Sequence, residues 1–447
     1  MSIWHIAWSY LWNRKLTTVL TILSVGLAVG LISAVLTLRA ETQKRFEEEG
    51  QAFDYVIGAN GSRLQLVLSS VYFMDSPVGN IKYSDYLKFK NDTEYVAAAF
   101  PISMGDSYQG FRIIGTTRSL MNHTWKHPVT EEEKSPYALS EGQYFEKPME
   151  AVVGYSAAIH GNLKVGQTFV GNHGMIELPD SLKLEDHANM PYTVVGILAP
   201  SNSPFDNAIY VTLDSVWNAH ADHDDEADTH VEEADTHDHD ADHTHDHNHD
   251  HGEEESLTDE FHAAPDAEVT AVLIQFHSPA YRLQYREHLD ELGSYNGAVP
   301  IDEIAIFFEK ILKPAKAMMM AVGYLVVVIS ALSILIGLYL SILQRKRDLA
   351  IMRALGASAY EIFGAVLIEA FLVTILGIIS GWFIGQTITA MVGIVLARDY
   401  GFVITPFGIT FEEINAFCTV GLVGLIAGIL PAWQAYNTDI ADDLADR

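Results

Sequence analysis

The sequence predicts a membrane protein of the α+β class, with four transmembrane helices and a large mixed α/β domain inserted between the first and the second. Two observations lead to this fold class. Hydrophobic residues make up 49% of the 447 residues although the formal net charge is −31, so apolar and charged residues must be segregated along the chain. The segregation is visible as four long apolar runs, with a long stretch of mixed composition between the first two.

Each apolar run is long enough to cross the roughly 30 Å hydrocarbon core of a bilayer as a helix. We assign transmembrane helices to residues 16–38, 317–343, 362–396 and 414–435. Four such runs in one chain disfavour the alternative that they are buried helices of a soluble protein. The third run contains one acid near its start, Glu369, which we expect to extend toward the membrane interface.

Lys and Arg residues near the ends of the runs indicate the orientation, because cytoplasmic loops carry an excess of them. The clusters are Arg14 and Lys15 before the first run, and Arg345, Lys346, Arg347 and Arg353 after the second. We therefore expect residues 344–361 to form a cytoplasmic loop and residues 436–447 a cytoplasmic tail, with both termini cytoplasmic. Residues 39–316 and the loop 397–413 are then extracytoplasmic.

Residues 1–15 precede the first run and carry tryptophan at every fourth position, as Trp4, Trp8 and Trp12. On a helix these indoles form one stripe, and indole prefers the headgroup region of a bilayer. We expect an interfacial helix along the cytoplasmic leaflet. Packing of the stripe against the transmembrane helices stays an open alternative.

Small residues recur at intervals of four inside two of the runs. They are Gly26 and Gly30 in the first run, and Gly377, Gly381 and Gly385 in the third. The Gly-x-x-x-Gly spacing lets two helix backbones approach closely in lipid. The pattern predicts helix packing at these positions, either within one chain or between two copies of it.

The extracytoplasmic segment predicts a mixed α/β domain with a charged helix at each end. Residues 40–53 and 301–316 are expected to be helices that extend the neighbouring spans. Between them, short runs rich in Val, Ile, Tyr and Phe alternate with turn residues, which is typical of strands.

Neither the composition nor the motifs of this domain indicate enzymatic chemistry. It contains no Gly-x-Ser-x-Gly or His-Glu-x-x-His motif, and the single cysteine, Cys418, lies in the fourth apolar run. Five scattered histidines have no ligand-like spacing, and we expect them to be solvated or to lie in the core: His123, His127, His160, His173 and His187. The acidity of the chain excludes nucleic acid as a partner, because nucleic-acid binding needs a basic surface.

Residues 219–260 form an insertion of extreme composition. From His220 to Glu255 there are 16 acidic residues and no Lys or Arg, which accounts for about half of the net charge. Such a segment cannot bury a core, so we expect it to be disordered. Its alternating histidines are His237, His239, His243, His245, His247, His249 and His251. Neutral imidazole is a ligand for zinc, copper and nickel, so we predict dynamic binding of zinc or another divalent metal, with a merely acidic, solvated insertion as the alternative.

Residues 345–357 have the sequence Arg-Lys-Arg-Asp-Leu-Ala-Ile-Met-Arg-Ala-Leu-Gly-Ala. This segment closely resembles the pattern R-x-x-E-I-G-I-L-R-A-L-G-A of FtsX-like, MacB-type ABC permeases, with Asp348 at the glutamate position. Weaker similarities follow in the family's order, at residues 12–23, 153–167, 192–211 and 431–435. The resemblance therefore covers nearly the whole chain apart from the histidine tract.

The resemblance implies the permease subunit of an ABC transporter in the bacterial inner membrane, with a MacB-like periplasmic core domain. It implies that the cytoplasmic loop forms a coupling helix that docks in a groove of an ABC ATPase. The residues implicated are Arg347, Asp348, Ile351, Met352, Arg353 and Leu355, with Gly356 ending the helix. No Gly-Lys pair occurs in the chain, so it lacks a Walker A loop and the ATPase is expected on a separate polypeptide.

The family further implies mechanotransmission by a homodimer or a paired permease, together with a periplasmic partner protein. ATP-driven closure of the ATPases would rearrange the periplasmic domains, without covalent chemistry in this chain. A function of a different class is also consistent with the residues: a metal-responsive membrane receptor or scaffold that has the same fold without a motor. No motif indicates the substrate or the direction of its movement.

Overall fold

The computed structural model describes residues 8–9, 11–12, 15–126, 133–174, 190–219, 267–292 and 295–437. The chain divides into two compact units. Unit 1 consists of Met1–Arg45, Ile306–Ala397 and Val403–Arg447, and unit 2 consists of Phe46–Ala305 and Arg398–Phe402. Most of the expected interfacial helix at residues 1–15 and of the tail at residues 436–447 lies outside the described residues.

Among the described residues, four helical stretches are long and apolar enough to cross a membrane. They are α2 (Lys15–Glu49), the stretch Pro300–Gln344, α12 (Ala359–Tyr400) and α13 (Phe411–Tyr436). The second stretch consists of α9 (Pro300–Phe307), a π-helical turn η2 (Phe308–Leu312) and α10 (Lys313–Gln344). The expected charged helix at residues 40–53 is the end of α2 and stops at Glu49, so residues 50–53 are not helical, whereas residues 301–316 lie within the second stretch.

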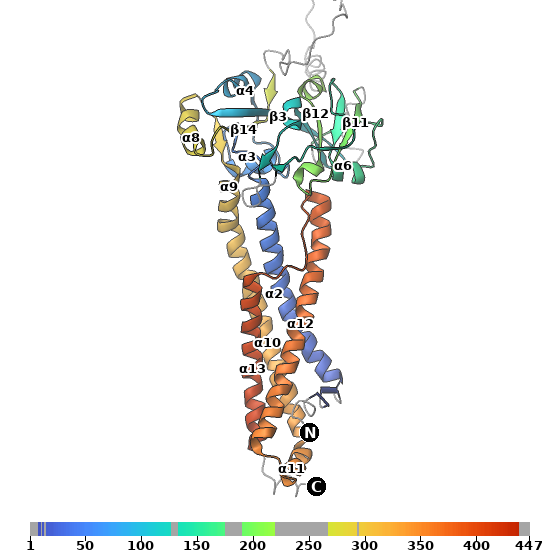
Figure 1. Cartoon of the computed structure of the whole chain (residues 1–447), viewed down its shortest axis with the longest axis vertical. Helices are drawn as coiled ribbons and strands as arrows, with labels where there is room; N and C mark the ends of the chain where they lie inside the picture. Colours follow the sequence, from blue (N-terminus) through green and yellow to red (C-terminus); the bar gives the residue numbers. More distant parts are fainter. Residues whose placement is uncertain are drawn as a thin grey trace, which may run out of the picture. The chain divides into compact units, whose positions relative to one another are not determined.

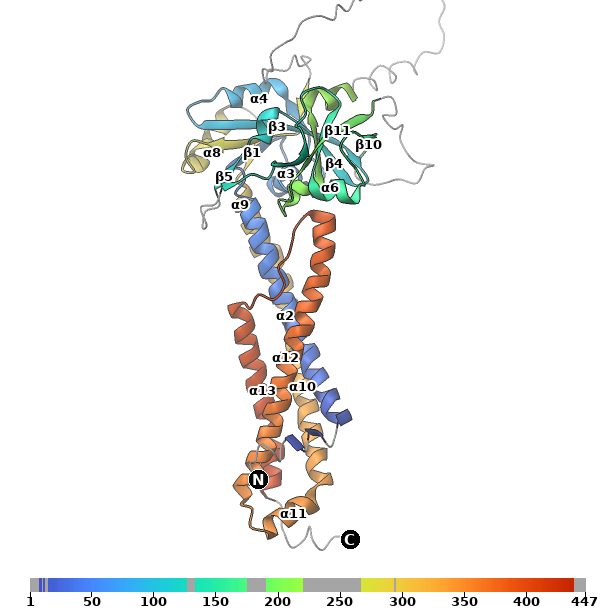
Figure 2. The same ribbon diagram turned by 45° about the vertical axis from the view of Figure 1, so that its right-hand side comes forward.

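In unit 1 the helices α10 and α13 run side by side (Figure 1, Figure 2). The interior of this unit is a cluster of Val, Leu, Ile and Ala side chains from α2, α10, α12 and α13. Helix α13 begins with a capping box, in which Thr410 accepts a hydrogen bond from the backbone N–H of Glu413 and the Glu413 side chain accepts one from the backbone N–H of Thr410. This reciprocal pair satisfies two backbone donors that a helix start otherwise leaves without a partner.

Unit 2 is built on a sheet of 11 strands in the order β15-β1-β14-β3-β4-β12-β8-β11-β7, with β10 paired to β3 and β9 to β11. The strands are β1 (Tyr55–Gly58), β3 (Val96–Tyr108), β4 (Phe111–Thr116), β7 (Leu139–Gly142), β8 (Glu150–Val153), β9 (Thr168–Phe169), β10 (Asn172–His173), β11 (Tyr192–Leu198), β12 (Ala208–Thr212), β14 (Ala271–Phe276) and β15 (Asn296–Ala298). Two pairs are parallel, β4 with β12 and β8 with β11, and the other pairs are antiparallel. Strand β12 is buried along its whole length, as expected of a central strand covered on both faces.

Short helices and two small strand pairs complete unit 2. They are α3 (Arg63–Ser70), α4 (Tyr83–Lys90), α5 (Arg118–Met121), α6 (Tyr155–His160), η1 (Pro204–Asn207) and α8 (Tyr281–Leu292), with β2 (Ile81–Lys82) paired to β13 (Glu268–Val269) and β5 (Trp125–Lys126) to β6 (Glu133–Lys134). One hydrophobic cluster packs α4 and α8 on β1 and β14, and a second packs α6 on β8, β11 and β12. The expected mixed α/β domain is therefore present, and these two clusters pack helices against its sheet.

An aromatic cluster in unit 2 encloses His123. Its ring stacks on Phe53 at a centroid distance of 4.9 Å and contacts Phe100 at 5.0 Å. Its Nε2 lies 2.8 Å from the carbonyl oxygen of Ala52. Burial among these groups lowers the pKa of His123 below its usual 6.5, against smaller raising effects of the Ala52 hydrogen bond and of Asp54. His123 is thus a core histidine whose burial favours the neutral imidazole.

The lowered pKa of His123 predicts that the unfolding free energy decreases as the pH falls below about 6.5. In this range the unfolded chain binds a proton that the folded chain does not, which costs up to about 1.4 kcal/mol per pH unit. We expect His123→Gln, which keeps a donor for the Ala52 carbonyl, to reduce this loss. The measurement is the Tm of both proteins between about pH 7.5 and pH 5.5. Identical pH slopes for the two proteins would contradict the assignment.

Candidate functional site

The cytoplasmic-loop motif forms the short helix α11 (Lys346–Ala354) between α10 and α12. It ends where Gly356 adopts a φ of +104°, a backbone conformation that glycine tolerates best. The N–H of Gly356 donates to the carbonyl of Arg353, and the N–H of Ala357 donates to the carbonyl of Met352, each at 3.0 Å. This pair of bonds is a Schellman motif, and it explains why the motif needs glycine at this position.

Helix α11 presents different side chains to the bundle and to solvent. Leu349 and Ala350 are buried, and Leu349 packs in a cluster with residues of α10, α12 and α13 on which Met352 also packs in part. Ile351 is 41% exposed and Leu355 is 83% exposed. Of the polar residues predicted beside them, Arg347 and Asp348 are exposed and Arg353 is half-buried. The outward apolar surface of α11 is therefore made by Ile351 and Leu355, whereas Met352 serves chiefly as an internal contact.

An ion pair fixes the connection between α10 and α12. The guanidinium of Arg345 lies 3.1 Å from the carboxylate of Glu369, and both side chains are close to fully buried. Arg345 Nε also donates to the carbonyl of Ser341 at 3.2 Å. The expectation that Glu369 extends to the membrane interface is wrong, because its carboxylate turns inward to this arginine. The two charges compensate each other where an unpaired charge would be costly.

The predicted glycine positions bring α2 and α12 into direct backbone contact. They are Gly26 and Gly30 on α2, and Gly377, Gly381 and Gly385 on α12. A Cβ added to Gly381 would lie 2.6 Å from the carbonyl oxygen of Gly26, and one added to Gly385 would lie 2.8 Å from that of Gly30. No side chain fits at these distances, so the five glycines form a contact within one chain.

A buried polar cluster beside this contact escaped the sequence reasoning. Glu413 is fully buried, and its Oε1 accepts hydrogen bonds from Ser33 at 2.5 Å and Thr37 at 3.0 Å. The side-chain amide of Gln386 lies 3.5 Å from the same oxygen. The cluster joins α2, α12 and α13 of unit 1. The spacing Thr410-x-x-Glu413 is a capping-box signal that identifies the start of α13, but nothing local indicates the partners of its glutamate.

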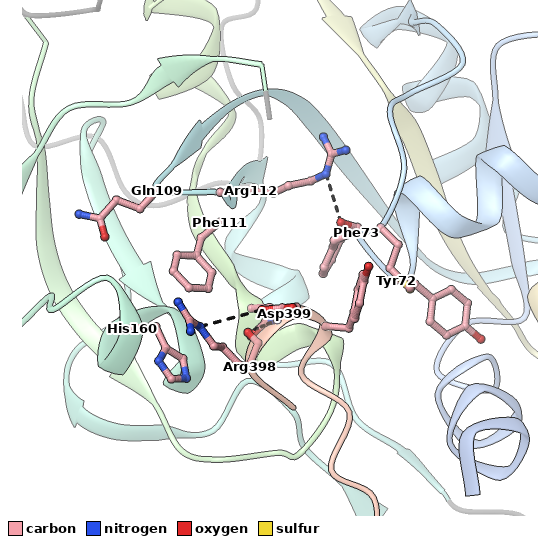
Figure 3. Close-up of a pocket in the computed structure, with 12 residues that line it drawn as sticks. Tyr72, Phe73, Gln109, Phe111, Arg112, His160, Arg398 and Asp399 are labelled. Carbon is pink, nitrogen blue, oxygen red and sulfur yellow. Dashed lines mark hydrogen bonds and ion pairs between the residues drawn. The ribbon is translucent and has the colours of Figure 1, made fainter. Parts of the chain in front are cut away.

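Unit 2 contains a cavity of about 570 Å³, with all of its lining residues inside that unit (Figure 3). The lining residues come from the segment 72–74, the β3–β4 turn at 109–112, the end of α6 at His160, η1 at Asn207, and the last turn of α12 at 398–400. No sequence pattern predicted this cavity, because its wall is assembled from five separate segments.

The predicted metal ligands between His237 and His251 lie outside the described residues. Within the part of the chain that the structure describes, no group of three or more His, Cys, Asp or Glu residues is arranged to hold a metal ion.

Two family models match the chain. One, described as MacB-like periplasmic core domain, matches residues 18–238, and the other, described as FtsX-like permease C-terminal, matches residues 320–440. Together they cover most of the chain, and it belongs to the FtsX-like permeases of the MacB type. It is thus an ABC transporter permease by family.

Individual relatives match the chain over segments that are shorter than the longer of the two family matches. It is 28% identical over 132 residues to an uncharacterized ABC transporter permease of Methanocaldococcus jannaschii, covering 28% of this chain and 33% of that protein. It is 35% identical over 118 residues to the macrolide export ATP-binding/permease protein MacB of Nitrosomonas europaea, covering 25% of this chain and 17% of MacB. It is 30% identical over 129 residues to the ABC transporter permease YtrF of Bacillus subtilis, covering 27% and 30%. The matched segment thus spans a third or less of each relative.

The glycine contact predicts opposite effects of the same substitution at two positions of α12. Gly381→Ala places a methyl group against the backbone of α2 and is expected to destabilise the protein by about 1–3 kcal/mol. Gly364→Ala is the control, because a Cβ at Gly364 has no atom within 4 Å in the described structure. It is expected to be neutral or to stabilise by up to about 1 kcal/mol through helix propensity. Thermal unfolding in detergent compares the two, and equal tolerance would contradict the contact.

Proposed function

We propose that the chain is the membrane-spanning permease subunit of an ABC complex and that it transmits the motion of a separate ATPase to its MacB-like domain. The observation that carries the proposal is α11, a short helix between two membrane helices that is buried on one side and exposes Ile351 and Leu355 on the other. Exposed apolar side chains flanked by charged residues are typical of a protein interface. The ATPase would bind this surface.

The internal contacts of α11 support a mechanical role. Leu349 packs in one cluster with residues of α10, α12 and α13, and the ion pair between Arg345 and Glu369 joins the end of α10 to α12. A force applied to α11 therefore acts on three membrane helices together. Packed interfaces of this kind move as rigid bodies because they do not deform continuously.

The proposed permease has a defined orientation in the membrane and defined partner subunits. The Lys and Arg residues around α11 favour the cytoplasmic side, so both termini would be cytoplasmic and unit 2 would face the periplasm of a bacterial inner membrane. We propose that two copies, or this chain and a paired permease, assemble with two ATPase subunits, and that unit 2 meets a periplasmic partner protein. The substrate is left open.

Leu355→Glu tests the proposed ATPase surface. The substitution puts a carboxylate on a side chain that is 83% exposed, so the protein is expected to fold while its association with the ATPase falls at least tenfold, because a charge is then buried without a partner. Leu283→Glu in α8 of unit 2 is the matched control, since Leu283 is also 83% exposed. The readout is ATPase co-purified from native membranes in mild detergent, together with ATP hydrolysis.

Retained association of the Leu355→Glu protein would refute the docking surface. If the wild-type chain brings down no ATPase even after crosslinking, the receptor or scaffold function without a motor becomes the better account.

We further propose that the histidine tract binds zinc or a similar divalent metal and thereby links the permease to external metal. The support is compositional: seven histidines alternate with acidic and small polar residues from His237 to His251. Protonated imidazole does not bind metal, so the affinity should fall as the pH drops below about 6.5.

Calorimetric titration of zinc into the full chain tests the metal proposal. We expect several zinc ions per chain at about pH 7.5 and a marked loss of binding at about pH 5.5. A variant with all seven histidines replaced by serine should lose most of the sites. A variant with His160 and His288 replaced by serine serves as the control and should keep them. Unchanged zinc stoichiometry in the seven-histidine variant would contradict the proposal.

A further inference from the structure

The cavity of unit 2 has the size and composition of a small-molecule site. Its volume of about 570 Å³ falls within the range of roughly 300–1,000 Å³ that is usual for ligand pockets. Phe111, His160 and Arg398 lie together on one side of it and Phe73 lies on the other, whereas the ring of Tyr72 is directed away from them (Figure 3). Aromatic surfaces and polar groups therefore face the same space.

The charges around the cavity favour an anion. Two guanidinium groups and one imidazole line it, from Arg112, Arg398 and His160, against the single carboxylate of Asp399. This excess is local, because the whole chain carries a formal net charge of −31. The Nε of Arg398 lies 4.0 Å from the Oδ1 of Asp399, which is a long ion pair, and the Arg398 side chain is 71% exposed. Most of its N–H donors are therefore directed to solvent.

Arg112 is the buried member of this group. It is 5% exposed, its Nε donates to the carbonyl of Phe73 at 3.2 Å, and its Nη2 donates to the carbonyl of Asp75. Within the described part of the chain no carboxylate forms an ion pair with it. Burial lowers the pKa of Arg112, opposed by the nearby Asp75 charge. Both of these hydrogen bonds are made to neutral carbonyl groups, so Arg112 adds positive charge to the wall of the cavity that Asp75 offsets in part.

A polar acceptor completes the lining. The Oδ1 of Asn207 is buried and has no hydrogen-bond partner among the described residues, while its Nδ2 donates to the carbonyl of Arg398 at 3.4 Å. A buried acceptor without a donor is costly, so a ligand N–H or O–H at this position would be favoured. A ligand that matches the positive charge, the Asn207 acceptor and the aromatic lining carries an anionic group, a neighbouring hydrogen-bond donor and an aromatic or apolar part.

We propose that this cavity binds a small organic carboxylate that bears an aromatic substituent and an adjacent amide N–H. The carboxylate lies toward the guanidinium of Arg398 and the imidazole of His160, the aromatic part lies against Phe111, and the amide donates to Asn207 Oδ1. One wall of the site is the last turn of α12, so the ligand contacts Arg398 and Tyr400 of a membrane helix directly. The binding itself does not depend on an ATPase.

The test compares two compounds of the same shape on the purified full chain in a neutral maltoside detergent. N-acetylphenylalanine carries the carboxylate, and N-acetylphenylalaninamide replaces it with a neutral amide. Isothermal titration is expected to show at least tenfold tighter binding of the acid. Inorganic phosphate, as an anion without an aromatic part, is expected to compete at least tenfold more weakly than the acid.

Two charge reversals then locate the site. Arg398→Glu lies on the cavity wall and is exposed, so the chain should fold and bind the acid at least tenfold more weakly. Arg286→Glu on α8 is the control, because Arg286 is an exposed arginine of unit 2 outside the cavity lining, and the affinity should not change. The proposal is overturned if the acid does not bind, if the amide or phosphate binds as well as the acid, or if Arg398→Glu leaves the affinity unchanged. None of these results bears on α11 or on ATPase association, so the two proposals fail separately.

Discussion

The close approach of α2 and α12 is the contact on which the arrangement of unit 1 depends. Gly30 and Gly385 meet backbone to backbone, and because both helices lack side chains there, the next turn brings Ser33 and Thr37 within hydrogen-bond reach of Glu413 and Gln386. The apolar surfaces of membrane helices do not select one register, since lipid solvates them equally well. The glycine contact and the polar cluster together select one register, because a shift of α2 takes the hydroxyl donors of Ser33 and Thr37 away from the buried Oε1 of Glu413.

A second polar contact in unit 1 has a different chemistry. Arg345 and Glu369 are both charged, and they connect the end of α10 to α12 beside the helix α11. Glu413 relies on hydroxyl and amide donors, whereas Glu369 relies on a cation, so neither substitutes for the other. Removing one partner of a buried ion pair typically costs about 3–5 kcal/mol, so the loss of either residue is expected to destabilise this connection.

Structural features that depend on neighbouring residues in the sequence could be predicted from it. Contacts between residues far apart in the sequence could not. Apolar runs predicted the four membrane helices, and the Gly356 motif predicted where α11 ends, because hydropathy and glycine conformation act over a few residues. Hydropathy did not show the direction in which Glu369 points, since the arginine that attracts it lies 24 positions earlier. The cavity was equally hidden, because Arg112 and Arg398 become neighbours only when β4 and the end of α12 meet in unit 2.

Helix α12 carries most of the features that matter for function. Its 42 residues correspond to a length of ~63 Å at 1.5 Å per residue, about twice the hydrocarbon core of a bilayer. Along this one helix lie Glu369 beside α11, the three glycines against α2, Gln386 in the polar cluster, and Arg398 in the cavity wall. An uninterrupted helix transmits axial and rotational displacement because its backbone hydrogen bonds leave few soft degrees of freedom. Within unit 1 this helix therefore connects the segment beside α11 to the contact with α2 and to the polar cluster around Glu413.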